Sequence, residues 1–257
     1  MERKKLTIIL AVVAFFGVLY FFFQRAEDSS EEMEVTVVTS FYPLYALAEE
    51  IGEGRAEVIN LTAPGRDPRH NRLSGGDMRM IREADILIYN GAGLEPWAEN
   101  IEEELKEEEV EIVDMSSYFR TVSREDGIED PYIWLDFLML NENARIILNK
   151  LIEVDEDGEE HYRENAKSAF AYLEELHTRY RVGLSDCRFN TVKVSEDNLR
   201  YMERRYGFNT RIVERGGDDV ISINTAKSPS RQELEEKDLF SIMRDNLRKL
   251  RERLDCR

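Results

Sequence analysis

Histidine is the commonest side-chain ligand of transition metals in proteins, and this chain of 257 residues contains only His70, His161 and His177. His161 and His177 stand sixteen residues apart within one predicted helix, a spacing that turns their side chains about 160° from one another. These two histidines therefore cannot share a metal ion, and we expect both to be solvated or packed. His70 lies between a predicted strand and a predicted helix, where open α/β sheets bind their ligands.

Two carboxylates flank an aromatic pair, because Asp130 and Asp136 stand on either side of Tyr132 and Trp134. Such acids can perform acid and base catalysis, but without a substrate cleft they more often cap helices or accept hydrogen bonds. The sequence contains no nucleophile elbow, P-loop or GxGxxG motif. We therefore predict a binding protein and not an enzyme.

The predicted elements that position these residues alternate between strand and helix over the first half of the chain. Hydrophobic patterning predicts strands over 34–39, 57–61, 85–89 and 110–113, separated by helices over 42–51, 77–84 and 96–105. Helices between successive strands are typical of a parallel sheet with right-handed crossovers. His70 falls in the loop after the second of these strands.

A longer helix follows, from residue 159 to residue 184. Its apolar side chains form one stripe, which consists of Tyr162, Ala166, Ala169, Leu173, Leu176, Tyr180 and Leu184. A helix of about 25 residues reaches close to 40 Å, which is longer than one small lobe requires. We expect it to be a spine that joins two lobes. The second lobe has few predicted elements, namely strands over 189–194, 210–213 and 220–223 and helices over 198–206 and 238–254.

The N-terminal segment has the length of a membrane span. Residues 6–23 are an unbroken apolar run behind Arg3, Lys4 and Lys5. Such a run reaches roughly 27 Å, and the bulky residues 21–24 do not resemble a signal cleavage site. An uncleaved anchor is therefore favoured over a cleaved signal, with the remaining chain extracytoplasmic. No cysteine stands near this segment, so lipid modification is not expected.

The net charge and the cysteine content limit which partners this chain can bind and in which compartment it can lie. A formal net charge of −18 disfavours nucleic acid, which an acidic surface repels. The two cysteines are Cys187 and Cys256, and their spacing fits neither a CxxC redox motif nor a zinc ribbon. In an oxidising compartment an even pair is usually bridged, so we predict a Cys187–Cys256 disulfide that fastens the C-terminal end.

Five segments together resemble the substrate-binding proteins of zinc and manganese ABC importers. They are VTSFYPLY (38–45), PGRDP (64–68), NGAGLEPW (90–97), DPYIWLD (130–136) and FSIMRDNL (240–247). The resemblance implies two Rossmann-like α/β lobes joined by a long helix, with a metal in the cleft between them. It also implies a location at the cell membrane and a transporter permease as the partner.

The same resemblance reveals departures at the metal site. Family members carry a histidine at each of three ligand positions, which here hold Arg69, Tyr132 and Glu196. A fourth ligand, an acid, is missing, because a short Gly-rich turn after Val213 replaces the units that carry it. The implied α/β fold therefore has a second lobe shortened by an internal deletion. Its parts are a membrane anchor or signal (1–25), a linker (26–33), an N-terminal lobe (34–140), connecting helices (141–186) and a reduced C-terminal lobe (187–257).

These substitutions weaken the case for zinc. Arg69 offers only hydrogen-bond donors and Tyr132 offers a phenol, which leaves His70 and Glu196 as ordinary ligands. We expect no tightly bound cofactor, and at most zinc or manganese held weakly. Two functions stay open: a binding protein that still serves a metal importer, and a repurposed interaction module or receptor for a non-metal ligand on the same fold.

The substitutions also point to a replacement for the metal. If Arg69 and Glu196 come from opposite lobes, a guanidinium and a carboxylate face one another across the cleft, with the Tyr132 hydroxyl beside them. We predict this ion pair as a metal-free bridge. The alternative, three unconnected surface residues in a cleft that no longer closes, stays equally open.

Overall fold

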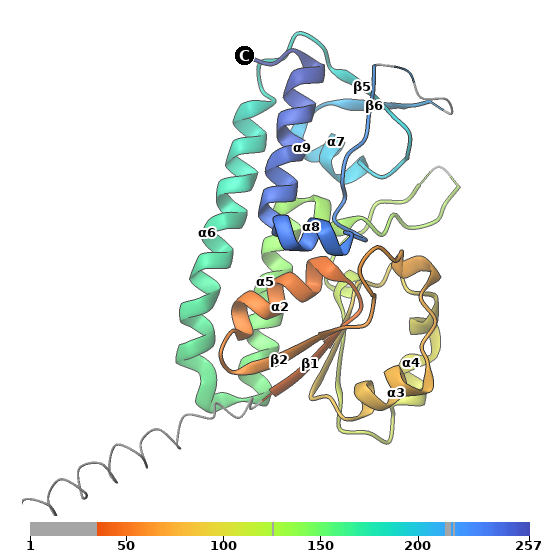
Figure 1. Ribbon diagram of the computed structural model, residues 1–257, viewed down its shortest axis with the longest axis vertical. Coiled ribbons are helices and arrows are strands. Elements are labelled where there is room, and N and C mark those ends of the chain that lie inside the picture. Colours follow the sequence, from red (N-terminus) through yellow and green to blue (C-terminus); the bar gives the residue numbers. More distant parts are fainter. Residues whose placement is uncertain (1–34, 125, 214–216, 218) are drawn as a thin grey trace, which may run out of the picture. The chain divides into compact units, whose positions relative to one another are not determined.

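The computed structural model describes residues 35–257, except residues 125, 214–216 and 218 (Figure 1). The predicted anchor over 6–23 and the linker that follows it lie outside the described residues. Within the described part of the chain, no helix is both long enough and apolar enough to cross a membrane.

The first sheet has four parallel strands in the order β2-β1-β3-β4. These strands are β1 (Val35–Thr39), β2 (Ala56–Asn60), β3 (Ile86–Tyr89) and β4 (Glu111–Asp114). The central strands β1 and β3 are almost entirely buried, as expected for a parallel sheet covered by helices. Successive side chains alternate, so that Ile86 and Ile88 pack into a larger core while Leu87 packs into a smaller one.

Helices cover both faces of this sheet. The helix α2 (Tyr42–Gly52) belongs to the larger core, whereas α3 (Gly75–Arg82) and α4 (Ile101–Glu104) contribute to the smaller one. At the start of α3, Ser74 and Asp77 form a capping box in which each side chain accepts from the other residue's amide. This arrangement leaves the carboxyl ends of the strands to the loops that carry the candidate ligands.

The predicted spine is the helix α6 (Glu159–Gly183), which contacts helices from both halves of the chain (Figure 1). Near its start, the Asn165 side chain donates to the Ile51 carbonyl at 3.2 Å. Near its end, the Tyr180 hydroxyl donates to the Met243 carbonyl at 2.7 Å. The apolar stripe predicted for this helix is buried, so its orientation is fixed along most of its length.

The second sheet has three parallel strands in the order β6-β5-β7. These strands are β5 (Thr191–Val194), β6 (Asn209–Ile212) and β7 (Val220–Ile221). The helices of this part of the chain are α7 (Arg200–Tyr206), α8 (Arg231–Glu236) and α9 (Leu239–Leu254). The two parallel sheets confirm the predicted α/β fold class.

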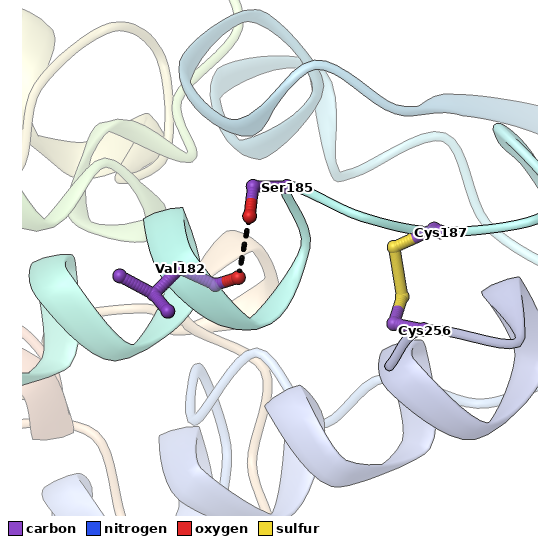
Figure 2. The surroundings of a disulfide bond; sticks show 4 residues. All are labelled: Val182, Ser185, Cys187 and Cys256. Carbon is purple, nitrogen blue, oxygen red and sulfur yellow. Dashed lines mark hydrogen bonds between the residues drawn. A yellow bond between two sulfur atoms is a disulfide. The ribbon is translucent and has the colours of Figure 1, made fainter.

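The predicted disulfide between Cys187 and Cys256 is confirmed, with an S–S distance of 2.01 Å (Figure 2). It joins the segment that leaves α6 to the end of α9, and the 69-residue separation encloses the whole second sheet. In the chain-entropy model, closing a loop of this length contributes about 4 kcal/mol to the free energy of unfolding. Three short strands bury little core of their own, so the cross-link supplies stability where the fold needs it.

Some elements differ from the predictions. The helix predicted over 96–105 is a 3-10 helix (Pro96–Asn100) followed by the single turn α4, because Ile101 is the one buried side chain of residues 96–104 and little apolar surface holds a longer helix in place. The helix α5 (Phe137–Val154) begins before residue 141, where the connecting helices are predicted to start, since the Asp136 side chain caps it by accepting a backbone hydrogen bond. The sequence pattern does not predict α8, which has only six residues.

Candidate functional site

The loop after β2 carries the predicted site residues Arg69 and His70. The Asp67 side chain accepts a hydrogen bond from the Arg69 amide at 3.0 Å and so caps the 3-10 turn that contains both residues. Gly65 adopts a left-handed φ of +76°, and its amide donates to the Pro229 carbonyl at 2.8 Å. This loop of the first sheet is therefore hydrogen-bonded to the segment that follows the second sheet.

The segment that carries Tyr132 is held in place by two acids. Asp130 accepts from the Tyr132 amide at 2.9 Å, and Asp136 caps α5. Both acids are buried, and both have the hydrogen-bonding and capping roles that the residue pattern indicates. Trp134 donates its indole N–H to the Thr225 carbonyl at 2.7 Å, which connects this segment to the chain after β7.

A bidentate ion pair fastens the same segment to α7. The Arg205 guanidinium donates from Nε to Asp136 Oδ1 at 3.0 Å and from Nη2 to Oδ2 at 2.6 Å. Only 6% of the Asp136 side chain is exposed, so this carboxylate depends on its partner for compensation. Tyr201 adds a further link, because its hydroxyl donates to the Asp130 carbonyl at 3.0 Å and accepts from the Val122 amide at 3.1 Å.

One more charged side chain lies between the loop and the Tyr132 segment. The Lys227 ammonium is 2.9 Å from the Asp67 carboxylate and donates to the Tyr132 hydroxyl at 3.3 Å. The Tyr132 ring centre is 5.6 Å from the same nitrogen, within the range of a cation–π contact. Since only 8% of its side chain is exposed, Lys227 is a buried cation. We refer to Lys227, Asp67 and Tyr132 as the ammonium cluster.

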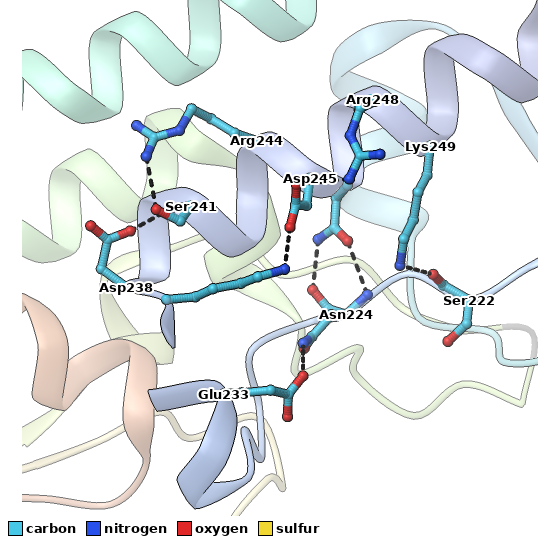
Figure 3. A network of polar contacts seen from close by, with 11 residues as sticks. Ser222, Asn224, Glu233, Asp238, Ser241, Arg244, Asp245, Arg248 and Lys249 are labelled. Atoms are coloured by element: carbon cyan, nitrogen blue, oxygen red, sulfur yellow. Dashed lines mark hydrogen bonds and ion pairs between the residues drawn. The ribbon is translucent and has the colours of Figure 1, made fainter. Parts of the chain in front are cut away.

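The backbone before Lys227 is fixed by several hydrogen bonds. Asn246 of α9 accepts from the Asn224 amide at 3.0 Å and donates to the Asn224 carbonyl at 2.6 Å. The Asn224 side chain donates to Glu233 at 2.9 Å (Figure 3). Ala226 is fully buried and has a φ of +57°, which is unusual for a residue other than Gly. Together with the bond from Trp134, these contacts hold the chain from which the lysine side chain extends.

The charges of this region reinforce one another. Burial alone would raise the pKa of Asp67, but hydrogen bonds from Arg69 and Lys227 lower that pKa well below its ordinary value. Asp67 is therefore ionised near neutral pH. The pKa of Arg69 is raised, chiefly by its hydrogen bond to Asp67 and to a smaller extent by the negative charge of Glu196.

The ion pair predicted between Arg69 and Glu196 is not formed. Arg69 contacts Asp67 instead, with Nη2 2.6 Å from Oδ2, and 44% of its side chain is exposed. Among the residues that the structure describes, Glu196 forms no ion pair with Arg69, and its carboxylate accepts from the Asn198 side chain at 3.2 Å. The prediction is wrong because Asp67, two residues before Arg69, holds the guanidinium within its own loop.

The remaining predicted ligands do not converge. The Tyr132 hydroxyl accepts from Lys227, and no hydrogen bond joins it to Arg69 or Glu196 within the described residues. His70 is exposed at the end of its turn, and Glu196 is exposed as well. In the described ranges, no group of three or more histidine, cysteine, aspartate and glutamate side chains could hold a metal ion.

The two histidines of α6 differ in exposure, since His161 is exposed and His177 is half-buried. The His161 Nε2 atom lies 2.6 Å from the Glu53 carbonyl oxygen. The His177 Nδ1 atom lies 3.4 Å from the Tyr206 hydroxyl, and burial lowers the pKa of His177. The two side chains are therefore solvated and partly packed, respectively, and neither lies beside the other predicted ligands.

The distinctive NGAGLEPW segment stabilises its own loop. Glu95 is buried and accepts from the Ser40 hydroxyl at 2.6 Å and from the amides of Asn90 and Gly91 at 3.0 and 3.1 Å. Burial raises the pKa of Glu95 to about 7. Gly91 has a φ of +74°, and a Cβ atom there would lie 2.0 Å from the Asp114 carboxylate, so only Gly fits.

Sequence reasoning missed the importance of Lys227 and of Asp67. Lys227 lies in the stretch 224–229, between the last strand and the closing helices, where no apolar periodicity marks an element. The available signal is a single lysine between Ala226 and Ser228-Pro229, in a stretch that is otherwise uncharged. Asp67 lies within the PGRDP segment, two residues before Arg69, which occupies one of the family's ligand positions.

Comparisons with known proteins agree with this arrangement. Residues 37–246 match the family model described as zinc-uptake complex component A, periplasmic. The manganese-binding lipoprotein MntA of Halalkalibacterium halodurans is 32% identical over 194 residues, which cover 72% of this chain and 63% of the relative. The high-affinity zinc uptake system protein ZnuA of Bacillus subtilis is 24% identical over 200 residues, covering 71% and 62%. The chain thus spans about three fifths of the length of these curated relatives.

Solved structures share the fold. The Zn(II)-bound ZnuA-like domain of Streptococcus pneumoniae AdcA superimposes with a TM-score of 0.80 at 18% identity, covering 86% of this chain and 99% of that domain. The metal-dependent lipoprotein YcdH of Bacillus subtilis gives a TM-score of 0.79 at 20% identity, with the same coverage. The matched family and relatives are binding proteins and not enzymes. Because the family match covers most of the described chain, the protein belongs to the ZnuA family of metal-binding solute-binding proteins of zinc and manganese ABC importers.

Proposed function

We propose that this chain is an extracytoplasmic solute-binding protein of the metal-importer type whose cleft has lost the metal site of its family. The first part rests on family membership and on relatives named for manganese binding and zinc uptake. The second part rests on the ammonium cluster and on the side chains at the family's ligand positions.

The observation that carries the loss of the metal is the buried Lys227 ammonium, 2.9 Å from the Asp67 carboxylate. The Lys227 ammonium already neutralises that carboxylate. A divalent metal ion at the same place would be repelled by the positive charge of the ammonium. The family ligand positions hold Arg69, Tyr132 and Glu196, which supply one carboxylate and no imidazole. Zinc sites combine three or four nitrogen, sulfur or carboxylate ligands, so this set disfavours zinc and manganese.

A shortened second lobe accounts for the missing fourth ligand. Only residues 213–219 separate β6 from β7, which leaves no room for a strand and helix unit that could carry an acid. This supports the organisation inferred from the sequence. An N-terminal lobe (34–140) and a reduced C-terminal lobe (187–257) are joined through the connecting helices (141–186).

The partner and the location follow from the family. The family model is described as periplasmic, and the relative MntA is named a lipoprotein, so we place this chain outside the cytoplasmic membrane. The apolar segment within residues 1–25 then acts as the anchor or signal, and the linker 26–33 follows it. The permease of an ABC importer is the proposed partner.

Two alternatives lead to different measurements. In the first, exposed His70 and Glu196 hold zinc or manganese weakly. In the second, the fold has become an interaction module or a receptor for a non-metal ligand. The ammonium cluster favours the second, because a carboxylate beside a phenol suits an amine better than a metal ion.

Calorimetric titration of the full-length chain with zinc and with manganese tests the proposed loss. We expect no saturable one-to-one binding of either ion to the wild-type protein. The matched control is the double variant His70→Ala/Glu196→Gln. Weak binding that disappears in this variant would support the first alternative, and tight one-to-one binding to the wild type would contradict the proposal.

A further inference from the structure

We propose that the ammonium cluster is a receptor for a primary alkylammonium group, which the chain fills with its own Lys227 and which accepts a free alkylamine when that side chain is removed. The inference rests on the proposed loss of the metal site. Beyond that loss, Asp67 and Tyr132 recognise an ammonium group, and the Lys227 side chain occupies the position of the ligand.

The contacts of Lys227 are those of a bound ammonium ion. Its nitrogen lies 2.9 Å from the Asp67 carboxylate and 3.3 Å from the Tyr132 hydroxyl, and the Tyr132 ring is 5.6 Å away. A carboxylate, a hydroxyl acceptor and an aromatic ring together satisfy charge and hydrogen bonding for a compact cation. The acceptors lie in segments remote from Lys227 in the sequence, so the lysine crosses from the chain after β7 to the first sheet's loops.

Among the lysines of the ion pairs in the described residues, Lys227 is the least exposed, and Lys150 follows with 19% of its side chain exposed. The Lys237 side chain is 42% exposed in its pair with Asp245, and the Lys193 side chain is 40% exposed in its pair with Asp219. Lys227 has 8% of its side chain exposed. The Lys237 and Lys193 pairs lie at the surface and contribute little to the free energy of unfolding. The Lys227 ammonium is shielded from water, and its contacts with Asp67 and Tyr132 replace the lost hydration.

The receptor groups have supports other than Lys227. Asp67 is held by hydrogen bonds from the Arg69 side chain, with Nη2 at 2.6 Å, and by its own turn. The Tyr132 ring packs against Trp134 with centroids 5.0 Å apart, and its amide donates to Asp130. Removing the lysine side chain therefore leaves a carboxylate and a phenol in position, together with the space that the lysine stem occupied.

Shortening Lys227 to alanine defines the ligand that fits. The change removes three methylene carbons and the nitrogen, which is the heavy-atom skeleton of n-propylamine. In the wild type the tethered ammonium has a high effective concentration and excludes a free amine. In the variant, propylammonium can restore the ion pair with Asp67 and fill the space of the removed stem.

The test is thermal unfolding of full-length Lys227→Ala protein at increasing n-propylamine concentration, near neutral pH. We expect the variant to melt about 3 to 6 °C below the wild type and to recover saturably with the amine, since a change of 1 kcal/mol corresponds to a few degrees in a chain of this size. The exposed pair supplies the matched control, Lys237→Ala, which should not respond. The wild type should not respond either.

Three comparison solutes separate the possible causes of recovery. 1-Propanol fills the same space without charge, tetramethylammonium has charge without N–H donors, and zinc tests for a restored metal site. Recovery with 1-propanol or zinc equal to that with propylamine would overturn the inference. So would an equal melting temperature of Lys227→Ala and wild type, or an equal response of Lys227→Ala and Lys237→Ala.

A second variant keeps the test decisive if Lys227→Ala does not fold. Lys227→Met retains most of the apolar stem and removes only the charge, and it should melt below the wild type. In a double-mutant cycle, Asp67→Asn should then lower the melting temperature less in the Lys227→Met background than in the wild type, because the carboxylate has already lost its ammonium partner. Equal falls in the two backgrounds would overturn the inference. The zinc titration of the wild type tests the proposed function separately. If the wild type binds zinc tightly, the proposed loss of the metal site fails, whereas the response of Lys227→Ala to propylamine can still be observed.

Discussion

Two ion pairs, each with one buried partner, join the first sheet's segments to the second part of the chain, and they differ in kind. Asp136 and Arg205 form a bidentate pair, in which the planar guanidinium matches both carboxylate oxygens. Asp67 and Lys227 meet through a single ammonium nitrogen, which also contacts Tyr132. The first contact fixes a geometry, whereas the second places a compact charge at a point where another cation of the same class could sit.

The difference also appears in what surrounds each carboxylate. Asp136 caps α5 and has Arg205 as its ion-pair partner, so its compensation depends on one side chain. Asp67 has two cationic partners, Arg69 and Lys227, of which Arg69 is exposed. The fold therefore depends strongly on the Asp136 pair, while the Asp67 pair can lose its lysine and retain a partly neutralised carboxylate.

Breaking the Asp136 pair should have the largest effect. Arg205→Met leaves a carboxylate with 6% exposure uncompensated, and we expect a loss of about 3–5 kcal/mol in the free energy of unfolding. Urea denaturation measures this loss. Arg204→Met is the matched control, since Arg204 is an exposed arginine on the same helix. Equal losses in the two variants would show that the Asp136 pair has no special role.

Removing the disulfide should have a comparable or slightly smaller effect. The double variant Cys187→Ser/Cys256→Ser opens a 69-residue loop, and we expect a loss of about 2–4 kcal/mol. Denaturation of the wild type with and without a reductant should give the same difference. A loss that appears in the variant but not on reduction would mean that the serines perturb the packing, and that the cross-link itself contributes little.

Acid should act on the Asp67 pair in a defined direction. Because the pKa of Asp67 in the folded protein is below its ordinary value of 3.8, the pair contributes stability that is present above that pH and is lost as the pH falls through the folded pKa. The difference in unfolding free energy between wild type and Asp67→Asn should stay constant near neutral pH and shrink below about pH 4. Chemical denaturation at a series of pH values measures it. A difference that already shrinks near neutral pH would contradict this assignment.

Arg69→Ala should have the smallest effect. The guanidinium is 44% exposed and pairs within its own loop, so we expect a change of at most about 1 kcal/mol. Glu196→Ala should be equally mild, because Glu196 is exposed and forms no ion pair with Arg69 in the described part of the chain. Thermal melts of both variants measure these changes. Losses as large as that of Arg205→Met would restore the predicted Arg69–Glu196 bridge.

The fold follows from the sequence where local patterns are strong. Alternating strands and helices predict the first sheet, the apolar stripe predicts α6, and the even cysteine count predicts the disulfide. The spine helix is predicted almost to its ends because its apolar stripe repeats from Tyr162 to Leu184, over about six turns of helix. Boundaries fail where a cap decides them, as at Asp136.

The candidate site is predicted less completely, because its contacts are long-range. The sequence identifies the loop with Arg69 and the segment with Tyr132, but it cannot show that Lys227 lies between them. That position depends on the Trp134 bond to Thr225 and on the Gly65 bond to Pro229, which join residues far apart in the chain. The expected Arg69–Glu196 pair also fails for a local reason, because Arg69 forms its ion pair with Asp67 in the same loop.

A crystal structure determined in the presence of zinc, with anomalous data collected at the zinc absorption edge, tests the central claim most directly. We predict that the cleft shows no anomalous peak and that the Lys227 ammonium stays within hydrogen-bonding distance of Asp67 and Tyr132. A strong zinc peak beside Asp67 or Glu196, with the Lys227 side chain displaced from Asp67, would contradict the account.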